Sequence, residues 1–178
     1  MQISLFQGVG LHVDGREVAL RGRKAQALIA YLVLSPGMKA TREQLVGLLW
    51  SEAEDAKARA SLRQLLHVLR VKFERAGVVG LSIDKLRVSL DESVFVTDLD
   101  RALASVDRGE PVDLLGNEPR ITDSLLPGYD DLDPSFTSWV RIKRESVRQQ
   151  LIRKLEEQLA DTSYGTTATK RIARTLFQ

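Results

Sequence analysis

Hydrophobic and polar residues alternate in the first twenty positions of the chain, and this pattern predicts short strands. The alternation runs over 9–13 and resumes over 18–20. Asp14-Gly15 lies between the two runs, and this pair is typical of a two-residue hairpin turn because such a turn needs positive φ. With an earlier short strand at 3–6, the sequence predicts a small N-terminal antiparallel sheet.

The pattern then changes to helical spacing in three successive stretches, 23–35, 41–50 and 55–76. The first is rich in Ala and Leu and stops at Pro36-Gly37. The second opens with Thr41-Arg42-Glu43-Gln44, which fits a capping box with Thr41 as N-cap. The sequence therefore predicts three helices after the sheet.

The predicted helix 55–76 has an uneven distribution of charge. Its leucines and Phe73 fall on one narrow face. No acidic residue lies between Lys57 and Phe73, although a surface helix normally mixes charges. The outward face is formed by Lys57, Ala60, Gln64, His67, Val71 and Arg75, and it is flanked by Arg59, Arg63 and Arg70.

The chain continues with a predicted hairpin and then with helices of a different character. Both arms of 81–90 alternate around Asp84-Lys85, which predicts a hairpin. Short helical spacing follows over 98–108, and an irregular connection over 109–128 contains three of the five prolines. Asp133-Pro134 predicts an N-cap and first turn for a long helix that runs to about 161. A final helix is predicted from about residue 167.

Composition and charge narrow the class of protein. The 178 residues include no cysteine, which excludes disulfides and thiolate metal sites. No secretory signal or membrane-spanning run is present, so we expect a cytoplasmic protein. Residues 1–90 hold 14 Lys and Arg against 8 Asp and Glu, whereas 91–178 hold 12 against 16. This split suggests two domains, and the basic half suits a phosphate-backbone binder, with ordinary scatter of charge as the alternative.

A search for catalytic motifs gives no enzyme prediction. Gly8-Val9-Gly10 begins a dinucleotide-binding pattern, but Val13 stands where its last glycine belongs. His12 and His67 have no ligand neighbour at useful spacing. Asp130, Asp131 and Asp133 suggest either a cation site or a solvated helix start, and we favour the second. We predict no catalytic residue, no metal and no cofactor.

The order of strands, three helices and hairpin predicts a winged helix-turn-helix that binds double-stranded DNA. A basic helix of this kind fits the major groove, where Arg reads guanine and Gln reads adenine. The predicted contacts of this helix are Lys57, Arg59, Arg63, Gln64, His67 and Arg70. Lys85 and Arg87 are the predicted contacts of the wing, and Thr41 and Arg42 are expected on a phosphate. The alternative for the arginines is a solvated, salt-bridged face.

The first half contains three sequence motifs: RKA-x-AL-x-AYL at 23–32, TREQL-x-x-LLW at 41–50 and ARASLRQL-x-x-x-LR at 58–70. Together these motifs resemble the SARP family of bacterial transcriptional activators. The second half resembles, more loosely, the bacterial transcriptional activator domain of that family, an all-helical, TPR-like module. That likeness rests on Leu126-Pro127-Gly128-Tyr129, Trp139-Val140, Arg144-Glu145 and the leucine spacing that follows.

The resemblance implies an OmpR/PhoB-type winged helix-turn-helix at 1–92 and a helical activator domain at 93–178. It further implies binding to direct repeats as head-to-tail pairs and contact with RNA polymerase, with helix 55–76 as recognition helix and 81–90 as wing. Gly22 and His67 depart from the family pattern. The activator domain is shorter than the family's, so we expect a fragment of a longer protein. The alternative function is a protein-interaction module that depends on the acidic residues 130–133 and the helix 134–161.

Overall fold

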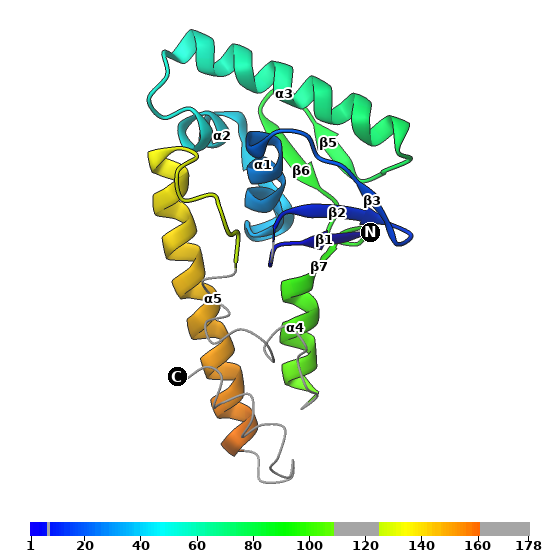
Figure 1. The fold of residues 1–178 in the computed structure, drawn as a ribbon, viewed down its shortest axis with the longest axis vertical. Helices are drawn as coiled ribbons and strands as arrows, with labels where there is room; N and C mark the ends of the chain where they lie inside the picture. Colours follow the sequence, from blue (N-terminus) through cyan, green and yellow to red (C-terminus); the bar gives the residue numbers. More distant parts are fainter. Residues whose placement is uncertain (7, 109–124, 161–178) are drawn as a thin grey trace.

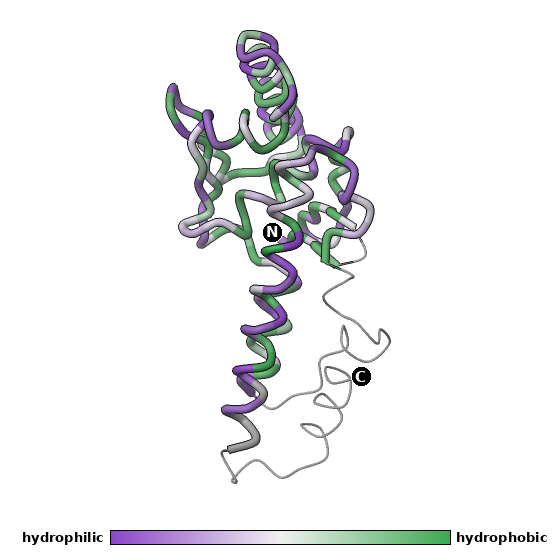
Figure 2. Tube along the Cα trace, turned by 90° about the vertical axis from the view of Figure 1, so that its left-hand side faces the viewer, coloured by the Kyte–Doolittle hydropathy of each residue, from purple (hydrophilic) through white to green (hydrophobic). Residues whose placement is uncertain are grey.

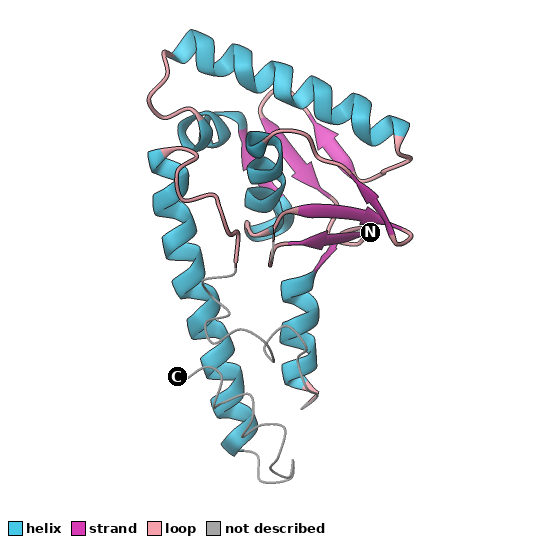
Figure 3. Ribbon diagram, in the orientation of Figure 1, coloured by secondary structure: helices cyan, strands magenta, loops and turns pink. Residues whose placement is uncertain are grey.

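Two small sheets and five α-helices make up the part of the chain that the computed structural model describes, residues 1–6, 8–108 and 125–160. Figure 1 shows the helix α3 (Asp55–Arg75) lying across one end of the molecule. The helices α4 (Asp98–Asp107) and α5 (Pro134–Ala160) extend from the sheets toward the opposite end. Figure 3 shows the sheets between these two sets of helices.

The first sheet gathers the N-terminal strands and one strand from much later in the chain. Its order is β3 (Arg16–Val18), β2 (Gly10–Val13), β1 (Gln2–Ser4) and β7 (Val96–Thr97). The β2–β3 turn at Asp14-Gly15 has φ of 48° and 79°, so the predicted hairpin is confirmed. β7 was not predicted, and it pairs in parallel with β1.

The two helices that follow begin and end as their sequences predict. α1 (Arg23–Val33) is largely buried, and Gly37, with φ of 64°, lies in the short 3₁₀ turn Pro36–Met38 after it. α2 (Arg42–Leu49) has the predicted capping box. The Gln44 backbone N–H donates to Thr41 Oγ1 at 3.1 Å, and Thr41 N–H donates to Gln44 Oε1 at 2.8 Å.

The second sheet lies beside α3. Its strands are β4 (Lys39–Thr41), β6 (Arg87–Leu90) and β5 (Leu81–Ile83), in that order. β5 and β6 form the hairpin predicted over 81–90, and Ile83 lies opposite Val88. β4 was not predicted. It joins the start of α2 to the hairpin through its pairing with β6.

The helices predicted at 98–108 and from Asp133 onward are confirmed as α4 and α5. α4 packs against β1, β7 and α5. The buried carboxylate of Asp98 accepts the backbone N–H groups of Leu5, Phe6 and Leu99 at 2.8–3.1 Å, which ties the end of β1 to the start of α4. The helix predicted from residue 167 lies outside the described residues.

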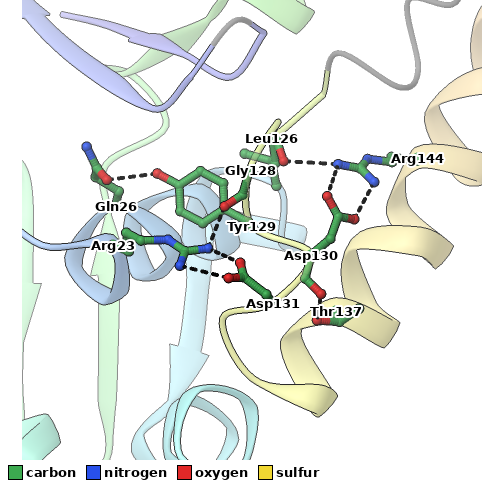
Figure 4. Close-up of polar contacts among 9 residues, drawn as sticks. All are labelled: Arg23, Gln26, Leu126, Gly128, Tyr129, Asp130, Asp131, Thr137 and Arg144. Carbon is green, nitrogen blue, oxygen red and sulfur yellow. Dashed lines mark hydrogen bonds and ion pairs between the residues drawn. The ribbon is translucent and has the colours of Figure 1, made fainter.

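The start of α5 is fixed to the N-terminal half by polar contacts, most of which Figure 4 shows. Arg23 of α1 donates to Gly128 O and pairs with Asp131. Tyr129 OH donates to Gln26 Oε1 at 2.8 Å. On the other side, Arg144 Nη1 pairs with an Asp130 oxygen at 2.6 Å. We call residues 125–133 the docking segment, because they bridge α1 and α5.

Aromatic packing and a second carboxylate complete this attachment. Trp139 of α5 lies between Tyr31 of α1 and Phe136, with ring centroids 5.0 and 5.2 Å apart. The buried carboxylate of Asp133 accepts the backbone N–H of Ser51 at 3.0 Å and its hydroxyl at 2.7 Å. One continuous apolar core therefore extends from the first sheet through α1 and α2 to α5. Figure 2 shows hydrophobic residues recurring along the long helix that extends away from the sheets.

The fold class predicted from the sequence, a winged helix-turn-helix followed by an all-α TPR-like domain, is wrong. The chain is too short for that combination, and its described part holds five α-helices and two small sheets. A TPR-like array needs stacked helix pairs that bury each other. After residue 92 the described chain instead contains β7, which joins the first sheet, and two helices, which pack against it and against α2. The boundary predicted between 92 and 93 stays a prediction.

Candidate nucleic-acid interface

The exposed surface of α3 is the strongest candidate for a binding site in the described structure. The helix has 21 residues, and one stripe of it is buried: Ala58, Leu62, Leu66, Leu69 and Phe73. Because this stripe covers only one side, the remaining positions face solvent over most of the helix. All six predicted contacts on α3 are exposed: Lys57, Arg59, Arg63, Gln64, His67 and Arg70.

The cationic side chains of α3 differ in how they are paired. Lys57 Nζ lies 3.0 Å from Glu54, and Arg59 Nη2 lies 3.3 Å from Glu43 of α2, both at exposed positions. Exposed pairs of this kind contribute little to stability and dissociate readily. Within the described part of the chain, Arg63, Gln64 and His67 make no hydrogen bond or ion pair. The middle of α3 thus carries positive charge and donors that no group of the described chain uses.

Four predicted contacts converge on one hollow between α3 and the β5–β6 hairpin. The hollow is lined by Arg42, Arg63, Leu66, His67, Arg70 and Ile83. Three guanidinium groups and an imidazole around one open space are suited to an anion, since guanidinium forks match phosphate oxygens. We call this feature the arginine hollow.

Hydrogen bonds hold the walls of the arginine hollow together. The backbone N–H of Arg42 donates to Leu86 O at 2.8 Å, and its Nε donates to Asp84 O at 2.9 Å. Arg70 Nη2 donates to Ile83 O at 3.2 Å. The hairpin is therefore fixed to the first turn of α2 and to the middle of α3, so these elements present one surface.

The tip of the hairpin is exposed and carries charges of both signs. Lys85 and Arg87 are exposed, as predicted for a contact surface, and Leu86 is 73% exposed. The Asp84 carboxylate accepts the backbone N–H groups of Leu86 and Arg87, each at 2.7 Å. These two hydrogen bonds hold the pKa of Asp84 below its usual value, and the bond from Leu86 has the larger effect. A negative charge thus lies beside the cations of the tip.

Thr41 has a structural role in addition to the one predicted for it. Its hydroxyl oxygen accepts the Gln44 N–H in the capping box, and its backbone belongs to β4. The acceptor side of the hydroxyl is therefore used within the fold. Arg42, one residue later, lines the arginine hollow through its side chain.

The three acidic residues before α5 form a helix start with one N-cap, as favoured from the sequence: Asp130 and Asp131 are exposed, and the Asp133 carboxylate accepts the Ser135 backbone N–H at 3.0 Å. Each carboxylate also has a partner within the chain. Asp131 pairs with Arg23, Asp130 pairs with Arg144, and Asp133 is buried against Ser51. In the described residues, no three His, Asp or Glu side chains gather as a metal site. Over the same residues, no helix combines the length and the apolar character needed to cross a membrane.

Comparisons with protein-family models, with curated proteins and with solved structures gave no match to this chain. The resemblance to the SARP family therefore stays a prediction that rests on the sequence motifs.

The sequence predicted the three arginines and the histidine of the arginine hollow as contacts, but it did not predict that they lie around one hollow. Arg42 lies 42 positions before Asp84, and a local pattern carries no signal for a contact at that separation. The contact of Arg70 with Ile83 has the same character, because it depends on how the hairpin turns back toward α3. The capping box at 41–44 was the one sequence signal that bears on this site, because it fixes where α2 begins and therefore where Arg42 lies in its first turn.

Proposed function

We propose that this chain binds double-stranded DNA in a sequence-specific manner and regulates transcription. The observation that carries the proposal is the exposed face of α3, which is free of acidic residues from Lys57 to Phe73 and adjoins the arginine hollow. A surface helix with this charge distribution supplies the electrostatic attraction that phosphate-backbone binding requires.

The shape of α3 suits the major groove. An α-helix with side chains is about 10–12 Å across, and the groove of B-DNA is about 12 Å wide. At about 1.5 Å per residue, the 21 residues of α3 are about 31 Å long. Arg63 and Gln64, both exposed and unpaired within the described chain, are the side chains we assign to base edges.

The arginine hollow and the hairpin are assigned to the sugar-phosphate backbone. A phosphate in the hollow would receive donors from Arg42 and Arg70, which belong to two helices held together by the hairpin. Such contacts position a protein on DNA without reading sequence. Lys85 and Arg87 extend the same cationic surface along the hairpin, with Thr41 at its base.

The wider role follows from the resemblance alone and is part of this proposal. We assign the chain to transcriptional activation, with head-to-tail binding to direct repeats and contact with RNA polymerase. The alternative, a protein-interaction module, depended on the acidic residues 130–133. Asp133 is buried against Ser51, and the exposed Asp130 and Asp131 are paired with Arg144 and Arg23, so a partner would have to compete with these pairs.

A binding selection from a random duplex DNA library at near-physiological salt tests the proposal. We expect an enriched motif, with two half-sites in the same orientation about one helical turn apart. The Arg63→Ala, Gln64→Ala double variant should lose the motif, whereas Arg101→Ala, an exposed arginine on α4, should keep it. Binding with no enriched motif would reduce α3 to a non-specific surface, and no binding would favour the interaction module.

A further inference from the structure

A second surface feature lies on the other flank of α3, away from the hairpin. It is a groove of about 620 Å³ between β3 and the C-terminal half of α3. We call it the β3–α3 groove. Its lining includes Glu17, Arg21, His67, Val68, Lys72 and Arg75. Of these, only His67 also lines the arginine hollow.

The lining of the groove combines an apolar floor with a cationic margin. Val68 is 47% exposed and provides the most accessible large apolar side chain of the floor. Arg21, Lys72 and Arg75 surround the floor, and Glu17 carries the one negative charge of the lining. Within the described chain, none of these three cations forms an ion pair or hydrogen bond. The excess of positive charge favours an acidic occupant.

The edge of the first sheet forms one wall of the groove. β3 is the end strand in the order β3-β2-β1-β7, and in the described chain it pairs only with β2. Figure 1 shows β3 as the strand of that sheet nearest to α3. An unpaired edge leaves a row of backbone donors and acceptors that an extended peptide can use by adding a strand.

We propose that the β3–α3 groove binds an extended segment of a partner protein in which acidic and apolar residues alternate. The segment pairs with β3 as an additional strand. Because side chains alternate along a strand, its apolar residues pack on Val68 and Val71 while its carboxylates meet the cationic margin. Neither Arg63 nor Gln64, the side chains assigned to bases, lines this groove, although it shares His67 with the arginine hollow. The test therefore includes a competing duplex DNA.

A peptide selection tests this inference directly. A displayed library of random 12-residue peptides is selected against the immobilised full chain, and enriched peptides are measured by fluorescence anisotropy. We expect enrichment of Asp and Glu together with Val, Ile or Leu. Val68→Glu, and separately Lys72→Glu, should weaken binding of these peptides at least tenfold. Val79→Glu is the matched control, because Val79 is 62% exposed and lies outside the groove.

Several outcomes would overturn the inference. They are the absence of an enriched peptide, enrichment of basic peptides, and binding that is equal for Val68→Glu and Val79→Glu. If a random duplex DNA displaces the peptides and binds Val68→Glu more weakly than the unmodified chain, that result assigns the groove to the nucleic-acid surface instead. Far-UV circular dichroism and thermal unfolding confirm that each variant is folded. Lys72→Ala provides a milder second variant that removes the charge without reversing it.

Discussion

At the scale of single residues, Arg63 is the side chain that best separates base recognition from general attraction to DNA. It is exposed, it lines the arginine hollow, and it has no partner in the described chain. If Arg63 reads a guanine, Arg63→Ala should cost about 1–3 kcal/mol of binding free energy on the selected site and relax specificity at one position. Titration of labelled duplexes measures this cost. Equal affinity of Arg63→Ala and Arg101→Ala would remove Arg63 from the interface.

Asp84 provides a second test at the scale of single residues, because removing its negative charge from the hairpin tip should strengthen DNA binding. Its charge lies beside Arg87 and Arg42, and its two backbone hydrogen bonds keep it ionised. Asp84→Asn keeps an acceptor for the turn but removes the repulsion of DNA phosphates, so duplex binding should tighten at low salt. The gain should shrink as salt rises, because the Debye length falls from about 10 Å at 0.1 M to about 3 Å at 1 M. Weaker binding by Asp84→Asn at all salt concentrations would contradict this.

At the scale of elements, the hairpin is proposed to position the protein on the DNA backbone, and the contact of Lys85 with a phosphate can be measured from the salt dependence of binding. Lys85 is exposed at the tip and makes no hydrogen bond or ion pair in the described chain. Lys85→Ala should weaken binding to all sequences alike and lower the slope of log affinity against log salt by about one unit. Affinities measured over a range of salt concentrations give the slope. An unchanged slope would place the hairpin away from the DNA.

The junction of β1 and α4 makes a prediction about stability. The carboxylate of Asp98, which is 7% exposed, satisfies three backbone N–H groups from two elements. Asp98→Ala leaves these buried donors unpaired and should lower the free energy of unfolding by at least about 2 kcal/mol. Glu92→Gln, at an exposed position without partners in the described chain, should change it by less than about 0.5 kcal/mol. Urea unfolding followed by circular dichroism compares the two variants, and a cost for Asp98→Ala no larger than for Glu92→Gln would contradict this role.

The elements themselves differ in how well the sequence predicts them, and local signals are the physical reason. α1, α2 and α3 have sustained apolar spacing and clear start or stop signals, such as the Thr41 cap and Pro36-Gly37. β4 has three residues and β7 has two, and neither belongs to a hairpin whose turn would mark it as a strand. Both strands form because longer strands, β6 and β1, offer an edge for pairing.

At the scale of the whole molecule, the fold class predicted for the second half is wrong for a single physical reason. The attachment of α5 depends on contacts between residues 82–109 positions apart, from Asp133 with Ser51 to Lys143 with Leu34. Local patterns carry no information at that separation. The second half was therefore assigned to a separate helical array, and the contacts of Asp131 and Asp133 with the first half were not predicted. In the structure the second half extends the core of the first half.

This organisation predicts that the N-terminal half depends on the rest of the chain for stability. A fragment 1–92 lacks β7 beside β1, the Asp98 acceptors of Leu5 and Phe6, and the α5 surface that covers α2 and Tyr31. Each apolar side chain uncovered in this way costs about 1.5–3 kcal/mol. We therefore expect the fragment to unfold at a clearly lower urea concentration than the full chain.

The full chain, by contrast, should unfold in one transition, because one apolar core joins the first sheet to α4 and α5. Circular dichroism follows both proteins, and fluorescence of Trp50 and Trp139 gives a second probe for the full chain. Coincident curves from the two probes are expected. A fragment as stable as the full chain, or two separate transitions in the full chain, would instead support an independent domain at 1–92. In that case DNA binding by α3 should persist in the fragment, whereas the coupled core predicts that the α3 surface loses affinity once α4 and α5 are removed.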